Sequence, residues 1–176
     1  MNELWIDISE IPAEGREFSF TDQAIWQNTA KGYQMDVDFS GEIRATFTVT
    51  PFGRGCAVFG TLQGDISMPC SRCLEPTALT LSQDIKISES LDDDVPTDER
   101  LLREAHGKIE LDAGTILWEQ FVLALPGKPL CTPQCKGLCA HCGADKNKNP
   151  CSCADSEGDP RLAALRNLKV ADRKKQ

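Results

Sequence analysis

Eight of the nine cysteines in this chain fall into two groups whose spacing suits metal binding. The first group is the pair Cys70 and Cys73, and the second is a tract near the C-terminus. The tract contains Cys131, Cys135, Cys139, Cys142, Cys151 and Cys153. Zinc in structural sites is held by four ligands in a tetrahedron, and all four can be cysteine thiolates. Eight thiolates are enough for two such sites, so the sequence predicts that the chain binds two zinc ions.

The spacing also indicates how the cysteines divide between the two sites. Cys139 and Cys142 form a C-x2-C turn that is followed by Gly143, and two further cysteines come after eight intervening residues. One predicted site is therefore local and consists of Cys139, Cys142, Cys151 and Cys153. The other joins a C-x2-C pair to a C-x3-C pair, a looser spacing that zinc sites still tolerate, and consists of Cys70, Cys73, Cys131 and Cys135. An exchange of Cys135 with Cys139, or a single metal with the remaining thiols free, stays open.

Clustered cysteines have other uses, which this sequence favours less. Disulfides suit a secreted protein, but residues 1–11 alternate apolar and acidic side chains and do not form a signal peptide. A redox C-x-x-C usually begins a helix, whereas Cys70 and Cys73 lie between two predicted strands. Iron–sulfur ligation uses the same four thiolates and stays open beside zinc. His141 lies between two predicted ligands, but with so many thiolates nearby we do not expect it to bind the metal.

The rest of the sequence contains no other pattern typical of catalysis. It has no glycine-rich phosphate loop, no nucleophile elbow and no histidine paired with carboxylates at a useful spacing. Cys56 lies on the apolar side of a predicted strand and is expected to be a core residue, while His106 is expected in a loop. We therefore expect no enzymatic activity and no catalytic residue.

The elements that must hold the cysteines are mainly β-strands. Apolar side chains recur at every second position in six segments: 4–8, 16–20, 33–39, 43–50, 56–68 and 79–88. Each of these segments keeps one polar face, which predicts antiparallel strands that cover one side of a core. Gly60 and Gly64 interrupt the fifth segment and indicate bulges or the close approach of another strand.

Helical patterns appear later in the chain. Residues 112–125 predict a helix that Asp112 can cap. Apolar side chains surround most of its axis, so we expect it to be buried against the sheet. The acidic segment 89–104 predicts a surface loop with a short helix at 99–105. A further short amphipathic helix is predicted at 160–168, after an Asp-Pro start signal.

These patterns predict an α+β fold in which an antiparallel β-meander or open barrel is packed by one buried helix. The β-rich body would span residues 1–125, and a cysteine-rich zinc-binding module with the short C-terminal helix would span 126–176. The longest apolar run, 116–126, contains Glu119 and is shorter than the about 20 residues that a membrane span needs. With neither a signal peptide nor a membrane span predicted, we expect a protein of the reducing cytoplasm, where clustered cysteines bind metal more often than they form disulfides.

Charge is distributed unevenly along the chain. Residues 1–125 hold 9 Lys and Arg against 22 Asp and Glu, a net charge of −13, whereas residues 126–176 hold 10 against 5, a net charge of +5. An acidic body with a basic end is typical of a C-terminal region that binds a partner, although a solvated, frayed chain end gives the same pattern. The expected contacts with RNA or a protein partner are Lys136, Lys146, Lys148, Arg161, Arg166 and Lys169.

With these motifs in view, the chain resembles members of the bacterial YceD family, also called domain of unknown function 177. Three features carry the resemblance. The first is Cys70-Ser-Arg-Cys73-Leu74 after a β-rich half, and the second is an apolar helix that ends in Leu-Ala-Leu-Pro at Pro126. The third is the cysteine tract 135–153, followed by Asp159-Pro-Arg161.

The resemblance implies a role in ribosome biogenesis. The family is linked to the accumulation of large-subunit (23S) ribosomal RNA, which implies contact with that RNA or with a ribosomal protein, and no enzymatic activity is attached to it. Ala140 and Lys146 depart from the usual pattern of the cysteine tract but leave the ligand assignment intact. Two other functions stay open from the residues: a thiol redox or zinc-handling protein, and an acidic protein–protein adaptor that uses segment 89–104.

Overall fold

The computed structural model describes residues 4–92, 96, 100–149 and 151–153. The chain divides into two compact units, residues 1–135 and residues 136–176. The first unit contains every helix and strand that the structure describes. Segment 126–135 lies with the first unit, and the division after residue 125 stays a prediction.

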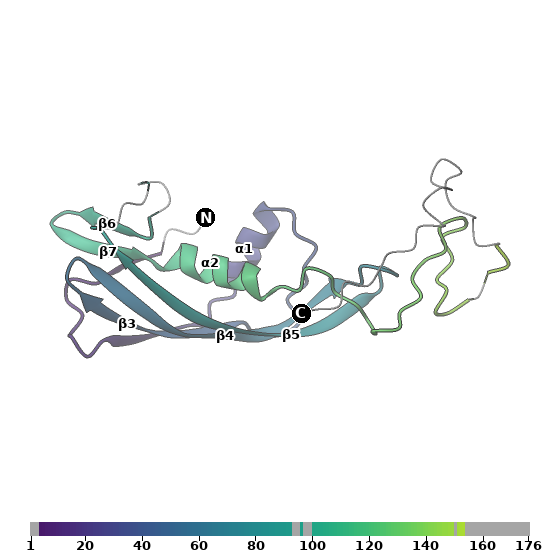
Figure 1. The fold of residues 1–176 in the computed structure, drawn as a ribbon, viewed down its shortest axis with the longest axis horizontal. Helices are drawn as coiled ribbons and strands as arrows, with labels where there is room; N and C mark the ends of the chain where they lie inside the picture. Colours follow the sequence, from purple (N-terminus) through teal and green to yellow (C-terminus); the bar gives the residue numbers. More distant parts are fainter. Residues whose placement is uncertain (1–3, 93–95, 97–99, 150, 154–176) are drawn as a thin grey trace, which may run out of the picture. The chain divides into compact units, whose positions relative to one another are not determined.

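The larger sheet has four antiparallel strands in the order β2-β3-β4-β5 (Figure 1). Its strands are β2 (Arg16–Phe20), β3 (Arg44–Phe52), β4 (Gly55–Pro69) and β5 (Pro76–Ser90). β4 and β5 pair along their whole length, from Gly55 opposite Ser90 to Pro69 opposite Pro76. The α+β class and the antiparallel pairing are confirmed. The strand order follows the chain, as in the predicted meander. The pairings of the described strands do not show the alternative, an open barrel.

A second sheet has three antiparallel strands in the order β1-β7-β6. Its strands are β1 (Trp5–Asp7), β6 (Leu102–Ala105) and β7 (Lys108–Asp112). The turn between β6 and β7 consists of His106 and Gly107, whose φ angles are 55° and 75°. Two consecutive residues with positive φ are what a tight two-residue hairpin turn requires. The prediction of a short helix at 99–105 is therefore wrong, and the His-Gly dipeptide is the turn signal that it overlooked.

Helix α2 (Ala113–Ala124) confirms the predicted buried helix. The Asp112 carboxylate caps it, because it accepts hydrogen bonds from the backbone N–H and the hydroxyl of Thr115 at 2.9 and 2.8 Å. Ile116, Leu117 and Phe121 are fully buried in the main core. Figure 1 shows α2 lying along one face of the larger sheet. Neither described helix is long and apolar enough to cross a membrane.

A second helix, α1 (Ala24–Gly32), is not predicted by the sequence patterns. Its Trp26 and Ala30 are buried four residues apart, which is the helical period, but two positions are a weak signal. The Gln23 side chain holds the start of the helix beside β3, since it bonds both the N–H and the C=O of Ile43, the residue before β3, at 2.9 Å. Tertiary contacts therefore define this nine-residue helix more than local preference does.

The predicted strand at 33–39 is wrong. Gln34 has a φ angle of 53° and comes directly after Tyr33, the C-cap of α1, where a left-handed residue commonly ends a helix. Beyond it, Val37 and Phe39 are half-buried against the core, but only Asp38 forms a β-bridge, which lies outside any strand. The bridge joins Asp38 to Ser67 of β4, so the period of two marks alternate burial in an extended segment that touches β4 at a single bridge and forms no strand.

Gly60 and Gly64 in β4 confirm the close approach that the sequence indicated. A Cβ at Gly60 would collide with the backbone of Thr46 and Phe47 in β3. A Cβ at Gly64 would lie 2.8 Å from the carbonyl oxygen of Glu42. At these two positions the neighbouring backbone occupies the space of a side chain, and only glycine is accommodated.

We predict that Gly60→Ala destabilises the protein by about 1–3 kcal/mol, because β3 must move to admit the methyl group. Gly32→Ala is the matched control, since a Cβ there meets nothing within 4 Å. The free energy of unfolding from urea titrations measures both variants. Equal stabilities would show that β3 and β4 do not approach as closely as described.

Candidate metal centres

The turn between β4 and β5 presents the first two cysteines. Pro69 and Pro76 pair at the ends of the two strands, and the connecting turn contains Cys70 and Cys73. The N–H of Cys70 donates to the carbonyl of Glu75 at 2.9 Å, and the N–H of Leu74 donates to the carbonyl of Cys70 at 2.9 Å. These bonds hold both thiols at the end of a long, rigid hairpin, where Cys70 and Cys73 are buried.

The segment that follows α2 brings the other two cysteines to this turn. The N–H of Ser71 donates to the carbonyl of Pro129 at 2.8 Å, and the Arg72 guanidinium donates to the carbonyl of Cys135 at 2.7 Å. Leu130 packs against the buried cysteines of this group. Hydrogen bonds from the turn thus fix segment 129–135 beside it, although it is distant in the sequence.

The four sulfurs of this group, which we call the hairpin centre, have the spacing of metal ligands. They all lie within 4.8 Å of one another. The Sγ atoms of Cys70 and Cys135 are 3.8 Å apart, and those of Cys73 and Cys131 are 3.6 Å apart. A tetrahedron with zinc–sulfur bonds of 2.3 Å has about 3.8 Å between neighbouring sulfurs. The donor set therefore fits a tetrahedral metal ion.

The second group, which we call the ribbon centre, lies wholly in the second unit. Its sulfurs also lie within 4.8 Å of one another and belong to Cys139, Cys142, Cys151 and Cys153. The N–H of Gly143 donates to the carbonyl of Cys139 at 2.9 Å, and Gly143 has a φ angle of 71°. The N–H of Cys139 donates to the carbonyl of Ala144 at 2.8 Å. This glycine-assisted turn points both of its thiols to one position.

Hydrogen bonds from the backbone lower the pKa of one thiol in each centre. The N–H of Cys131 makes the largest contribution at Cys70, whose pKa is lowered to about 6. The N–H of Cys142 makes the largest contribution at Cys139, whose pKa is also lowered to about 6. Interactions with the thiols of Cys142 and Cys139 raise the pKa of Cys153 to about 12. The first thiolate of each centre forms readily, and its negative charge opposes ionisation of the other three thiols. A divalent cation offsets this repulsion and so favours the state in which all four thiols are ionised.

The structure places the remaining sequence candidates as follows. Cys56 is buried in the core, and burial raises its thiol pKa to about 11. His106 lies in the β6–β7 turn, and His141 is exposed. Lys136 and Lys148 are exposed and Lys146 is half-buried, all in the second unit. Outside the described residues lie Arg161, Arg166, Lys169 and the predicted helix at 160–168. The roles of these residues stay predictions.

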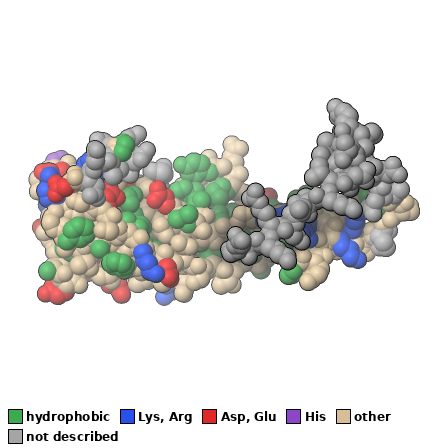
Figure 2. Space-filling view, viewed as in Figure 1, with side chains coloured by type: hydrophobic (Ala, Val, Ile, Leu, Met, Phe, Trp, Pro, Cys, Tyr) green, Lys and Arg blue, Asp and Glu red, His purple; other side chains and the backbone are tan. Residues whose placement is uncertain are grey.

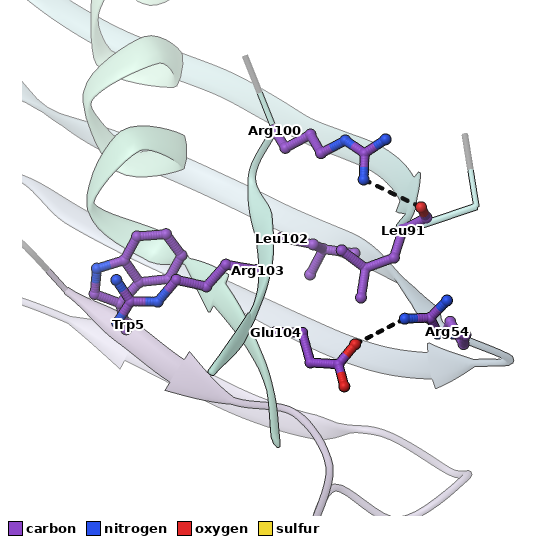
Figure 3. Close-up of a pocket in the computed structure, with 7 residues that line it drawn as sticks. All are labelled: Trp5, Arg54, Leu91, Arg100, Leu102, Arg103 and Glu104. Atoms are coloured by element: carbon purple, nitrogen blue, oxygen red, sulfur yellow. Dashed lines mark hydrogen bonds and ion pairs between the residues drawn. The ribbon is translucent and has the colours of Figure 1, made fainter. Parts of the chain in front are cut away.

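A pocket of about 510 Å³ in the first unit was not predicted (Figure 3). Three arginines line it, and each is already engaged there. Arg54 lies 2.8 Å from the Glu104 carboxylate, Arg100 donates to a backbone carbonyl, and the guanidinium of Arg103 lies 3.7 Å from the centre of the Trp5 ring. The Arg54–Glu104 pair links the β3–β4 turn of the larger sheet to β6 of the smaller one. Together the three contacts leave the pocket without the features of an anion site.

The stretch from residue 58 to residue 169 matches the family described as Large ribosomal RNA subunit accumulation protein YceD. It includes most of β4, all of β5 and α2, and both sets of four cysteines. The chain belongs to the YceD family. The predicted resemblance is thereby confirmed, and the family's description links it to ribosomal RNA of the large subunit.

Relatives of this YceD chain include uncharacterized proteins of Mycobacterium bovis and Mycobacterium tuberculosis. Each is 29% identical over 121 residues, which cover 66% of this chain and 57% of the relative. The chain thus spans little more than half the length of the curated relatives it matches. No solved structure matches it significantly.

We predict that each centre binds one divalent metal ion, so the purified, reduced protein holds two. Cys135→Ser removes one ion and Cys142→Ser removes the other, since each removes one of four ligands. Cys56→Ala is the control and keeps both, because Cys56 lies in the core. Elemental analysis measures the metal content. A wild-type protein without metal, or variants with unchanged content, would contradict the assignment.

Proposed function

We propose that this protein is a non-enzymatic assembly factor that supports the accumulation of large-subunit (23S) ribosomal RNA in the cytoplasm. The observation that carries the proposal is the family match over residues 58–169, which includes both cysteine centres. The family's description speaks of accumulation and names no reaction, which supports a role in binding. The pocket in the first unit supports the same view, since its arginines are engaged within the protein.

We further propose that both centres hold zinc. All-sulfur sets of four with C-x2-C spacing are typical of structural zinc, and iron is the alternative that metal analysis distinguishes. In the described part of the second unit, Cys139 is the only buried apolar residue. That unit therefore has little hydrophobic core to stabilise it. Structural zinc contributes about 10–16 kcal/mol of apparent binding energy in zinc fingers, which is ample to replace a core.

The charges divide the expected contacts between two kinds of partner. Phosphate groups are attracted by Lys and Arg, which are in excess in residues 126–176. Lys136, Lys146 and Lys148 are the described residues that we propose for RNA contact. The acidic residues 1–125 oppose RNA but suit a basic ribosomal protein. Binding to RNA is accordingly modest and depends on the second unit.

We predict that removal of the metal unfolds the second unit while the larger sheet persists. After chelation, backbone amides of residues 136–153 should exchange hydrogen rapidly, because the metal replaces a hydrophobic core there. Amides of β4 and β5 should stay protected, since they pair in a sheet with its own core. Hydrogen exchange with mass spectrometry measures both regions, and added zinc should restore protection. Unchanged exchange after verified metal loss would count against the proposal.

We predict that the full chain co-sediments with large-subunit precursors. The double variant Lys136→Glu, Lys148→Glu should bind more weakly, and the logarithm of its affinity should fall less steeply with salt, by about one unit of slope per lost phosphate contact. The double variant Lys31→Glu, Lys86→Glu, with one change in α1 and one in β5, is the control that makes the same change in net charge. Gradients over a salt series measure both effects. Failure of the wild type to co-sediment would overturn the proposed function, and equal binding by the double variant would overturn the RNA contact.

A thiol redox or zinc-handling protein is the second candidate. The lowered pKa of Cys70 and Cys139 favours it, because thiolates are the reactive form of cysteine. Cys131, Cys142 and Cys153 are also exposed. Titration of the native protein with a thiol reagent separates the two functions: structural zinc leaves few reactive thiols, whereas redox chemistry requires several that react quickly.

A further inference from the structure

Helix α2 is apolar on its outer side as well as on its buried side. Ile116, Leu117 and Phe121 face the core and are fully buried. On the other side, Val122 is 40% exposed and Leu123 is 66% exposed. A helix on the surface of a globular protein normally presents polar side chains to water. Packing within the first unit therefore does not explain why the outer side of α2 is apolar.

Two aromatic rings extend this face onto the end of α1. Tyr33 is 60% exposed and stacks on Trp118, with ring centres 5.5 Å apart and planes inclined by 10°. Trp118 in turn contacts the buried ring of Phe121 at 5.6 Å. The half-buried ring of Trp118 is thus held by the core and in turn holds the exposed ring of Tyr33, so both rings lose little conformational freedom when a partner binds. Tyr and Trp are also the residues most enriched at energetically important positions of interfaces.

We call Tyr33, Trp118, Val122 and Leu123 the α2 patch. A shallow hollow of about 300 Å³ lies in it, lined by Trp118, Glu119, Val122 and Leu123. Figure 2 shows hydrophobic side chains gathered over the position of α1 and α2, with acidic side chains beside them. A contiguous exposed apolar surface with a charged rim is typical of a protein–protein interaction site.

The charge at the patch indicates the chemistry of its partner. Glu119 is the only charged residue of α2. Partial burial, and then the charges of Asp112 and Glu89, raise the pKa of its carboxyl group. A cation from a partner would relieve this repulsion, whereas a second copy of the chain would bring another Glu119. Anionic lipid and nucleic acid are opposed in the same way by the net charge of −13 on residues 1–125.

We propose that the α2 patch is a docking surface for a basic protein segment. The segment inserts an apolar side chain into the hollow between Trp118 and Leu123, and it pairs a Lys or Arg with Glu119. An amphipathic helix laid into an apolar groove has this combination of contacts. The choice of large-subunit ribosomal proteins as the source of the segment rests on the proposed function.

A photo-cross-linking amino acid at position 123 tests the surface directly. The full chain is mixed with proteins extracted by salt from purified large ribosomal subunits and irradiated, and cross-linked peptides are identified by mass spectrometry. We expect peptides rich in Lys and Arg that also carry apolar residues. The control has the same group at Phe59, which is 55% exposed on β4. Cross-links to a second copy, equal cross-linking at both positions, or none at all would overturn the proposal.

Affinity measurements with the captured protein give the second test. Leu123→Glu and Glu119→Lys should each weaken binding at least about tenfold, as truncation of important interface residues does. Phe59→Ser should leave binding unchanged. If the wild type co-sediments with precursors and neither patch variant weakens binding, the docking surface is overturned while the proposed function stands. Failure of co-sedimentation overturns the function, and the cross-links then decide on the docking surface separately.

Discussion

The register of β4 against β5 is the constraint on which the first unit depends. Fifteen residue pairs join the two strands. Because side chains alternate between the faces of a sheet, this register places Val58, Leu62 and Ile85 in the core together, and a slip of one residue would turn a whole strand over. The same register closes the hairpin at two prolines and leaves one short turn for Cys70 and Cys73.

The two cysteine centres serve parts of the chain with different needs. The hairpin centre lies in a unit that has its own core, and hydrogen bonds from Ser71 and Arg72 already hold segment 129–135 at the turn. A metal there would strengthen a link that exists. The ribbon centre lies in a unit whose described residues bury almost no apolar surface. A metal there would supply most of the stability, so its loss would affect the second unit first.

The basic residues 126–176 and the apolar face of α2 suit two different kinds of binding. The basic residues 126–176 suit phosphate, and their attraction weakens as salt rises. The α2 patch relies on apolar burial with one carboxylate at its rim, and apolar burial is far less sensitive to salt. Under the proposed function, the basic residues would contact RNA and the α2 patch would contact a protein.

Patterns within short segments determined much of this protein. Alternation predicted β3, β4 and β5, the apolar sequence with Asp112 before it predicted α2, and cysteine spacing predicted sets of four that coincide with the two centres. These features depend on residues a few positions apart in the sequence, because the periods of strands and helices decide which of those residues share a face. The family resemblance rested on the same motifs.

Other features depend on contacts between distant segments and were decided by the tertiary structure alone. Helix α1 exists because Trp26 enters the core and Gln23 bonds Ile43. Segment 33–39 pairs with β4 at the single bridge of Asp38 to Ser67 and forms no strand, although its pattern alternates. The apolar character of α2 was visible in the sequence, but the exposure of Leu123 was not. Local preference and spacing specify which elements form, whereas the packing of one element on another specifies which faces are buried and which remain to meet a partner.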